Sequence, residues 1–350
     1  MSLRKRCCAL LLLLLALLCA CSSGKSAESY SLTVWYASDG DPLAPCLEQL
    51  AETYNAAREK GSLPVTLRGF ADEDALARAL NNGAMPDLLL CSHALAFTLY
   101  EHGLLLSPGV TVEGYPAWLT ERSGCVGRGF YPLGFDLPLL CTPEGTDLTL
   151  PALLDESSAL GRAAGRPYIG VDAFAPLFYQ TLLDAGIEFT ADPDRDQFDE
   201  CYVNLYNALT AAVFDRGLTM DTEQDLPCRL ERASALRGRD LTGCALHPLS
   251  TGALLAEGRG LAVTSREPRS QRDLPRFLRW LLTPERLSAA AQTSGLIPAV
   301  PVVADGSDPL AAALTALSGR ELHLPDGESQ YYANRSAFEA AFRSALELLH

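Results

Sequence analysis

The chain of 350 residues lacks the short motifs of the common catalytic and phosphate-binding sites. It contains no G-x-S-x-G, no H-E-x-x-H and no G-x-x-x-x-G-K-[ST]. Its five histidines show no metal-ligand spacing. Ser92 and His93 are adjacent, but a catalytic pair is recognised by its geometry in space, so adjacency alone indicates little. We therefore expect no catalytic residue, no metal and no cofactor.

Paired cysteine motifs are also missing, because no C-x-x-C occurs, and this disfavours a zinc or redox site. Of the eleven cysteines, three lie within residues 1–20 and one is Cys21, which leaves an odd number that cannot all pair within the chain. Cys91 and Cys141 lie inside apolar runs, where cysteine packs as a small hydrophobic residue. Whether any of these cysteines pair stays open.

The chain's long apolar run, from Cys7 to Ala20, is too short for a membrane helix of about 20 residues. It follows a basic stretch at residues 4–6, so residues 1–20 are predicted to be a secretion signal. Leu18-Cys-Ala-Cys21 resembles a lipobox, in which the cysteine is acylated, for example with palmitate. The alternative is an ordinary cleaved signal without lipid. We expect an extracytoplasmic protein anchored to the cell membrane by lipid at Cys21, with residues 21–29 as a flexible tether.

Positive charge is scarce relative to negative charge, with a formal net charge of −15 for the whole chain. The predicted signal carries three of the cations, so the mature protein is more acidic still. A strongly acidic surface argues against nucleic acid as a partner. The length suggests two domains.

The sequence has no internal repeat and no low-complexity domain, and it predicts a succession of strands and helices. Short apolar runs predict strands, and amphipathic segments predict helices. The predicted strands are 31–37, 63–70, 86–91, 168–171, 241–247 and 260–264. The predicted helices are 42–60, 72–82, 94–103, 150–164, 173–185, 197–216, 274–282, 283–294, 310–317 and 336–349. Strands that alternate with helices indicate βαβ units and a parallel sheet.

Three segments within residues 241–300, and two turns earlier in the chain, are similar to segments of a known protein family. The segments are Gly258–Ser265, Phe277–Glu285 with its Thr-Pro-Glu helix start, and Ser294–Pro298; the turns are Gly83–Asp87 and His102–Leu106. In this order and spacing they resemble the extracellular solute-binding proteins of ABC importers, particularly the sugar-binding branch.

The resemblance implies a periplasmic-binding-protein-like α/β fold with two lobes. Each lobe would be a mostly parallel sheet flanked by helices, with a cleft between the lobes. The first lobe would comprise 30–137 plus 261–300, and the second 138–260 plus 301–350. The chain would cross between them near Leu133–Pro138 and Leu261–Ser265, and the lobes would close by a hinge motion.

Candidate ligand contacts follow from the rule that ligands bind beyond the carboxyl ends of parallel strands. In a two-lobed protein both sets of strand ends face the cleft. The candidates are Tyr36, Ser38, Asp39, Ser92, Asp172, Phe174, Ser250 and Arg259. The aromatic rings could stack on sugar faces, while carboxylates and Arg259 could pair with hydroxyls. We expect Arg259 to reach the ligand from the second lobe's side.

Each candidate also has a structural interpretation. Tyr36 could be a core residue and Arg259 could form a surface ion pair. Asp72 is better explained as a helix cap, and His93 as a polar residue at a helix start. A Tyr331-Tyr332 pair is similar to the tyrosine pairs of ferric-iron binders, but no second set of iron ligands is visible.

The resemblance therefore implies a monomeric solute-binding protein, without catalytic activity, that captures a small solute and delivers it to ABC permease subunits. A carbohydrate is the favoured solute; polyamines, acidic or phosphorylated molecules and metal chelates stay open. The alternatives are a ligand-sensing lipoprotein that signals to a membrane partner, and an exported lipoprotein enzyme.

Overall fold

The structure is a computed structural model that describes most of the chain after residue 29. The described residues are 30–122, 124–146, 149–171, 174–187, 195–222, 224–264, 267–302, 308–325, 339–344 and 347. The predicted signal, tether and Cys21 lie outside these ranges, as do Asp172 and the tyrosine pair at 331–332. Of the predicted last helix, residues 339–344 are described and are helical.

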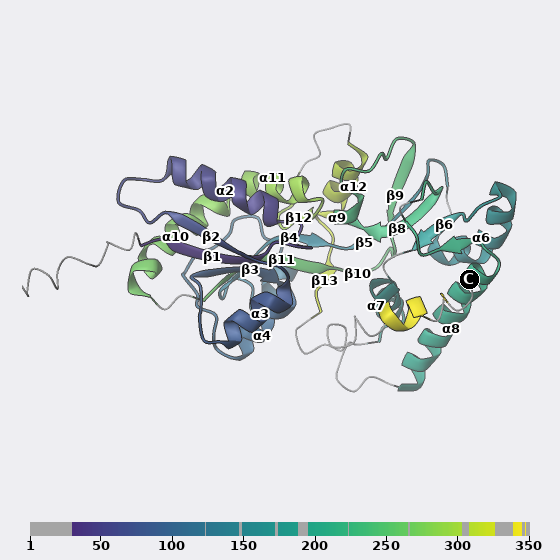
Figure 1. Ribbon diagram of the computed structural model, residues 1–350, viewed down its shortest axis with the longest axis horizontal. Helices are drawn as coiled ribbons and strands as arrows, with labels where there is room; N and C mark the ends of the chain where they lie inside the picture. Colours follow the sequence, from purple (N-terminus) through teal and green to yellow (C-terminus); the bar gives the residue numbers. More distant parts are fainter. Residues whose placement is uncertain are drawn as a thin grey trace, which may run out of the picture.

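Two sheets, each flanked by helices, form two lobes along the long axis of the molecule (Figure 1). The first sheet has the order β12-β4-β11-β3-β1-β2 and the second β7-β6-β8-β5-β9. The predicted two-lobed α/β architecture is confirmed.

The first lobe contains the larger sheet. Its strands are β1 (Leu32–Ala37), β2 (Val65–Phe70), β3 (Leu88–Ser92), β4 (Phe130–Asp136), β11 (Glu257–Val263) and β12 (Ile297–Pro298). Its helices are α2 (Ala44–Ala57), α3 (Glu73–Asn81), α4 (His93–Glu101), α5 (Ala117–Arg122), α10 (Pro268–Leu281) and α11 (Pro284–Ser294).

The second lobe contains the smaller sheet. Its strands are β5 (Pro138–Pro143), β6 (Ile169–Val171), β7 (Leu218–Thr219), β8 (Cys228–Arg232) and β9 (Cys244–Pro248). Its helices are α6 (Leu150–Ala164), α7 (Phe174–Asp184), α8 (Arg195–Phe214) and α9 (Ala233–Leu236). Helix α12 (Pro309–Leu317) and the short pair β10 (Leu254–Leu255) and β13 (Leu322–His323) lie near the junction of the lobes (Figure 1).

Local sequence signals define the helix ends next to the first sheet. Asp72 begins α3 by accepting a hydrogen bond from the Ala75 backbone N–H at 2.6 Å. Thr283 caps α11 in the same way, with Pro284 in the first turn. Gly295 ends α11 in the left-handed conformation, with φ of 67°, which glycine adopts without strain.

The sheets are mixed rather than mostly parallel. Strands β2, β1 and β3 are parallel, as the alternation of strands and helices predicts. Strand β11 runs antiparallel to both β3 and β4, because the chain enters β11 from the second lobe but enters β3 and β4 from the first. The second sheet is mixed too, with β6 parallel to β7 and β8, and β5 antiparallel to β8 and β9.

The first crossing between lobes is at Leu137, between β4 and β5, within the segment predicted for it. The return crossing is at Ala256, between β10 and β11, and so precedes the predicted segment at 261–265. Residues 257–260, which the prediction assigned to the second lobe, therefore pair in the first sheet. The glycines explain the difference: a Cβ on Gly260 would lie 2.3 Å from the Tyr131 carbonyl oxygen, so glycine lets β11 pair closely with β4.

Three apolar clusters form the core, one within each lobe and one that extends across both lobes. One packs α2, α10 and α11 on a face of the first sheet, and another packs α6, α7 and α8 in the second lobe. The remaining cluster runs from the other face of the first sheet, through Leu137 and Leu139, to α9 and α12. The crossing strands are thus anchored in an apolar core that both lobes share. Within the described ranges, no helix has the length and apolar character needed to cross a membrane.

Candidate functional site

The first group of polar residues follows the carboxyl ends of β1 and β2. The backbone N–H and the hydroxyl of Ser38 both donate to the Phe70 carbonyl oxygen, at 2.7 and 2.8 Å. The Asp39 N–H donates to the Ala71 carbonyl at 3.0 Å, and both Ser38 and Asp39 are exposed. Ser38 thus fixes the two strand ends side by side, and the Asp39 carboxylate stays accessible at this edge.

A cluster of four residues lies beside that edge, and we call it the Arg259 cluster. Arg259 Nη1 lies 3.6 Å from both Asp41 Oδ2 and Glu73 Oε2. Glu73 Oε1 accepts hydrogen bonds from the Ser92 hydroxyl at 2.7 Å and from the Ser92 N–H at 3.2 Å. Arg259 and Ser92 are opposite each other in the β11–β3 pair. Four elements therefore converge: the loop after β1, the start of α3, the end of β3 and β11.

The Arg259 cluster carries more negative than positive charge. The Asp41 side chain is 2% exposed, and burial raises the pKa of its carboxyl group even though Arg259 acts to lower it. Glu73 is more accessible, with 37% of its side chain exposed. With two carboxylates for one guanidinium, Arg259 is already neutralised, and carboxylate oxygens remain as hydrogen-bond acceptors.

A further charged group, which we call the crossover cluster, occupies the place where both strands pass between lobes. Asp136, the last residue of β4, is directly opposite Glu257, the first residue of β11. Arg232, at the end of β8 in the second sheet, lies 2.9 Å from Glu257 and 3.9 Å from Asp136. The Ser234 hydroxyl donates to Asp136 Oδ2 at 2.6 Å. Opposed carboxylates repel, so Arg232 stabilises the pair from the other lobe.

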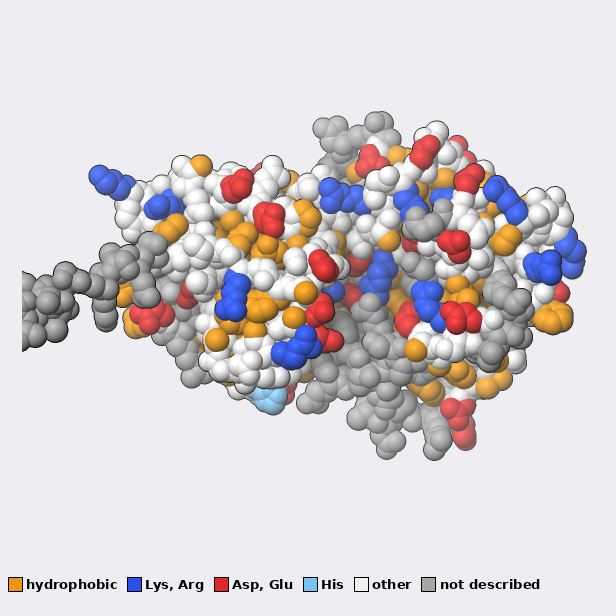
Figure 2. Space-filling view, viewed as in Figure 1, with side chains coloured by type: hydrophobic (Ala, Val, Ile, Leu, Met, Phe, Trp, Pro, Cys, Tyr) orange, Lys and Arg blue, Asp and Glu red, His pale blue; other side chains and the backbone are white. Residues whose placement is uncertain are grey.

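The crossover cluster is buried. Asp136 and Glu257 are 5% and 4% exposed, and burial raises the pKa of Asp136 although Arg232 and Ser234 act to lower it. The gap that adjoins them, lined also by Pro138, Pro176 and residues 255–256, is too narrow to hold a water molecule. Figure 2 shows acidic and basic side chains next to one another where the two lobes meet.

Two predicted aromatic contacts lie in the core instead. Tyr36 is 7% exposed and packs in the first-lobe cluster, and its hydroxyl donates to Glu48 at 2.7 Å. Burial and Glu48 raise the pKa of Tyr36 to about 12. Phe174 is completely buried and stacks on Phe342 at 5.9 Å. Neither ring presents a face to solvent, because each falls on the core side of its element, and this corrects the stacking role expected for both.

The remaining predicted contacts are spread over different places. Ser92 belongs to the Arg259 cluster and also caps α4. The Ser250 hydroxyl accepts from the Gly252 N–H within its own turn, at 3.0 Å. Asp172 lies outside the described residues. Arg259 extends from a first-sheet strand, which corrects its expected position on the second lobe's side.

Sequence reasoning missed five charged residues that the structure brings together: Asp41, Glu73, Asp136, Arg232 and Glu257. Asp41 lies two positions after Asp39, and Glu73 lies one position after Asp72. The strand-end rule had already singled out Asp39 and Asp72. The other three become neighbours only because β4, β8 and β11 meet at the crossing, and no spacing in the sequence reports that meeting.

The two clusters offer hydrogen-bond acceptors and donors rather than a reactive group. Among the described residues, no group of three or more His, Cys, Asp or Glu side chains is arranged to hold a metal ion. His93, which the sequence places near this region, is 2% exposed and its ring packs against Phe130. The arrangement suits the recognition of hydroxyl or amino groups.

Neither a protein-family model nor a curated protein matches the chain. Solved structures do match it in fold. The cyclic alpha-maltosyl-1,6-maltose binding protein of Arthrobacter globiformis shares a TM-score of 0.68 at 15% identity, over 92% of this chain and 95% of that one. The GacH receptor of Streptomyces glaucescens, solved unliganded and with acarbose, gives 0.70 at 13% identity, over 92% and 94%.

The spermidine/putrescine ABC transporter substrate-binding protein PotD of Streptococcus pneumoniae gives a TM-score of 0.60 at 13% identity, over 92% of this chain and 99% of that chain. At such identities the likeness establishes the fold, and the match extends over nearly the whole length of both chains. The chain thus has the complete two-lobed architecture of these binding proteins.

Proposed function

We propose that this protein captures a small polyhydroxylated solute, a carbohydrate, between its lobes and delivers it to the permease subunits of an ABC importer. The proposal rests on the two charged clusters, one at the strand ends and the other at the crossing between lobes. Sugar-binding proteins have the same fold over nearly the whole length of the chain. Binding there requires no covalent chemistry.

The charge balance of the clusters favours a neutral solute over an anionic one. Each guanidinium faces two carboxylates, so neither Arg232 nor Arg259 is available to neutralise an added anion. Sugar hydroxyls both donate and accept, and can donate to carboxylate oxygens while accepting from guanidinium N–H groups. Hydrogen bonds that involve a charged partner contribute roughly 1.5–3 kcal/mol each.

The position of the crossover cluster supports capture by lobe closure. Asp136 and Glu257 end the strands that cross between lobes, and Arg232 holds them from the second sheet. A solute that bridged the lobes here would favour the orientation in which both lobes contact it. We include the predicted lipid anchor at Cys21 in the proposal, because an anchored binding protein stays near its importer.

A polyamine is the second candidate solute. The excess of carboxylates in the two clusters would attract an ammonium group, and one structure of the same fold is a spermidine/putrescine binding protein.

Titration calorimetry with three classes of solute tests the proposal. Maltotriose represents neutral sugars, spermidine represents polyamines, and glucose 6-phosphate represents anions. We expect saturable binding of the sugar, weaker or no binding of spermidine, and none of the phosphate. Tight binding of the anion would contradict the charge argument, and failure of a broad panel of sugars and polyamines to bind would overturn the proposed function.

A further inference from the structure

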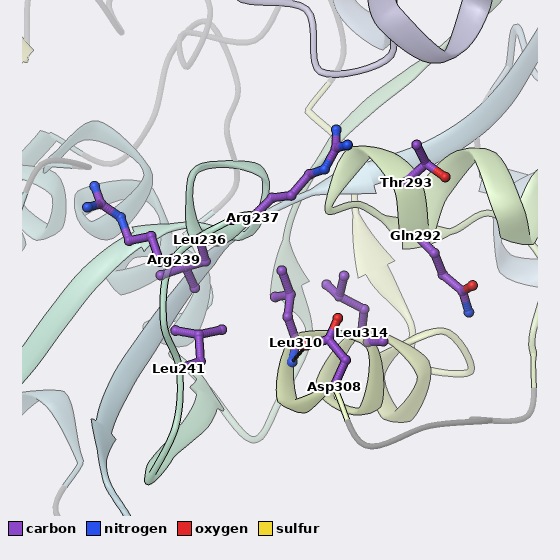
Figure 3. A pocket seen from close by; sticks show the side chains of 11 residues that line it. Leu236, Arg237, Arg239, Leu241, Gln292, Thr293, Asp308, Leu310 and Leu314 are labelled. Atoms are coloured by element: carbon purple, nitrogen blue, oxygen red, sulfur yellow. Dashed lines mark hydrogen bonds between the residues drawn. The ribbon is translucent and has the colours of Figure 1, made fainter. Parts of the chain in front are cut away.

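A separate cavity of about 340 Å³ lies among α9, α11 and α12, and none of its lining residues belongs to the two charged clusters (Figure 3). Its size is within the range of small-molecule sites, which are typically about 300–1,000 Å³. We call it the α12 pocket. The α12 pocket is thus separate from the proposed sugar site.

The floor of the α12 pocket is apolar. It is formed by Leu236, Leu241, Leu310 and Leu314, each of which is 6% exposed or less. The leucine side chains come from either side of the cavity, as Figure 3 shows. Because the leucines expose little of their surface, the gain from covering them is modest, at roughly 25 cal/mol for each Å² of apolar surface removed from water.

The rim of the α12 pocket is polar and carries the arginines Arg237 and Arg239 and the carboxylate of Asp308. Arg239 is directed away from the cavity in Figure 3, and its Nε lies 2.9 Å from the buried Glu231. The Asp308 carboxylate accepts from the Leu310 N–H at 3.0 Å, capping α12. Arg237 is exposed, and among the described residues no ion pair involves it. The rim therefore offers an anion Arg237 on one side, whereas Asp308 keeps its own negative charge at the start of α12.

We propose that the α12 pocket binds a small amphipathic anion, an apolar chain that ends in a carboxylate, with the chain over the leucine floor and the carboxylate on Arg237. The planar guanidinium fork matches a carboxylate, which can accept two parallel hydrogen bonds from it.

Occupancy of the α12 pocket also affects the orientation of the lobes. Residues 236–241 follow β8 of the second sheet, whereas Gln292 and Thr293 belong to α11 of the first lobe. A rotation of one lobe against the other changes the width of a cavity whose walls come from both. A ligand that fits one width therefore shifts the equilibrium toward the lobe orientation that has that width.

The experiment is titration calorimetry with octanoate, and with octan-1-ol as the uncharged probe. Arg237→Gln removes the cation. Arg279→Gln is the matched control, because Arg279 is an exposed arginine on α10 outside the pocket. Ala311→Trp fills the cavity from its half-buried lining position. Melting temperatures without probe verify that each variant is folded.

We expect saturable octanoate binding to the unaltered protein and to Arg279→Gln. Binding should weaken roughly ten- to a hundredfold in Arg237→Gln, the cost of one charged hydrogen bond, and should be lost in Ala311→Trp. Octan-1-ol should bind the unaltered protein and Arg237→Gln alike. Absence of saturable binding, equal affinity in both arginine variants, or full binding by Ala311→Trp would overturn the site.

Small-angle X-ray scattering with saturating octanoate tests the coupling to the lobes. The radius of gyration should change in the unaltered protein and stay constant in Ala311→Trp. A constant radius in both, with octanoate bound, would refute the coupling. These results do not depend on which solute the sugar site takes, so they fail or succeed separately from the proposed function.

Discussion

Replacing Arg259 by alanine should weaken both ligand binding and folding stability, and the loss of stability should depend on pH. Arg259 Nη1 lies 3.6 Å from Asp41 and from Glu73. At that separation the gross attraction of one pair is about 4–5 kcal/mol for an effective dielectric constant of roughly 20. Glu73 is more than a third exposed, so water screens most of its share. The buried Asp41 carries the effect.

The net cost is smaller than the gross attraction, because the free energy of desolvating both charges offsets much of it. We expect the variant to lose about 1–3 kcal/mol of unfolding free energy at neutral pH. Replacing an arginine in an exposed surface ion pair would cost almost no unfolding free energy. The larger loss expected here follows from the structure, which places Arg259 beside the buried Asp41.

The sign of the pH dependence follows from Asp41. Burial raises the folded-state pKa of Asp41 above the ordinary value of an aspartate, so ionised Asp41 lowers stability as pH rises through that pKa. Removing Arg259 raises the pKa further, so this loss becomes larger at neutral pH. Below the folded-state pKa, Asp41 is protonated in both proteins, and the difference between them should shrink.

Urea unfolding at pH 7.5 and at pH 4 measures both effects, with Arg279→Ala as the exposed-arginine control. The expected result is a clear loss for the Arg259 variant at pH 7.5 and a smaller one at pH 4. An equal loss at both values, or no loss at either, would refute the assignment of Asp41 as the partner that matters.

Three other substitutions test separate parts of the account. Cys21→Ser should move the protein from the membrane fraction to the soluble fraction and abolish labelling with a radioactive fatty acid; a variant that stays labelled would refute the lipobox. Gly260→Ala should destabilise the fold by about 1–3 kcal/mol, since its Cβ would clash with β4, whereas Gly252→Ala should cost little in the same urea assay. Arg232→Met should remove the guanidinium that faces the two crossover carboxylates and cost about 2–4 kcal/mol at pH 7.5, less at pH 4; a variant as stable as the wild type would show that the crossover cluster does not hold the lobes.

The architecture could be predicted where local signals and packing agree. The helix at 150–164 was predicted with the bounds that the structure has, because its apolar face repeats at helical spacing between a proline and Gly165. Strand β8 was missed, since its sequence, CRLER, carries three charges. Its Glu231 is fully buried and forms an ion pair with Arg239, eight residues later. A pattern of hydrophobicity cannot report a buried charge whose partner comes from another element.

The site proposed here could be predicted from the sequence only to the level of the strand ends. The strand-end rule led to the edge where Ser92 and Arg259 lie opposite each other, which is part of the proposed site. This rule could not show that the side chains of Tyr36 and Phe174 lie on the core side. Which side a residue at the end of a strand or helix faces depends on the register of the neighbouring elements. The rule also missed Glu257, which the glycines around position 259 made look like part of a loop.

The central claim is that the lobes close on a neutral sugar without changing it. The most direct measurement is small-angle X-ray scattering of the protein before and after addition of a sugar that calorimetry shows to bind. The radius of gyration should fall on addition and return to its first value when the sugar is removed by dialysis. A radius that stays constant while the sugar is bound would contradict capture by lobe closure.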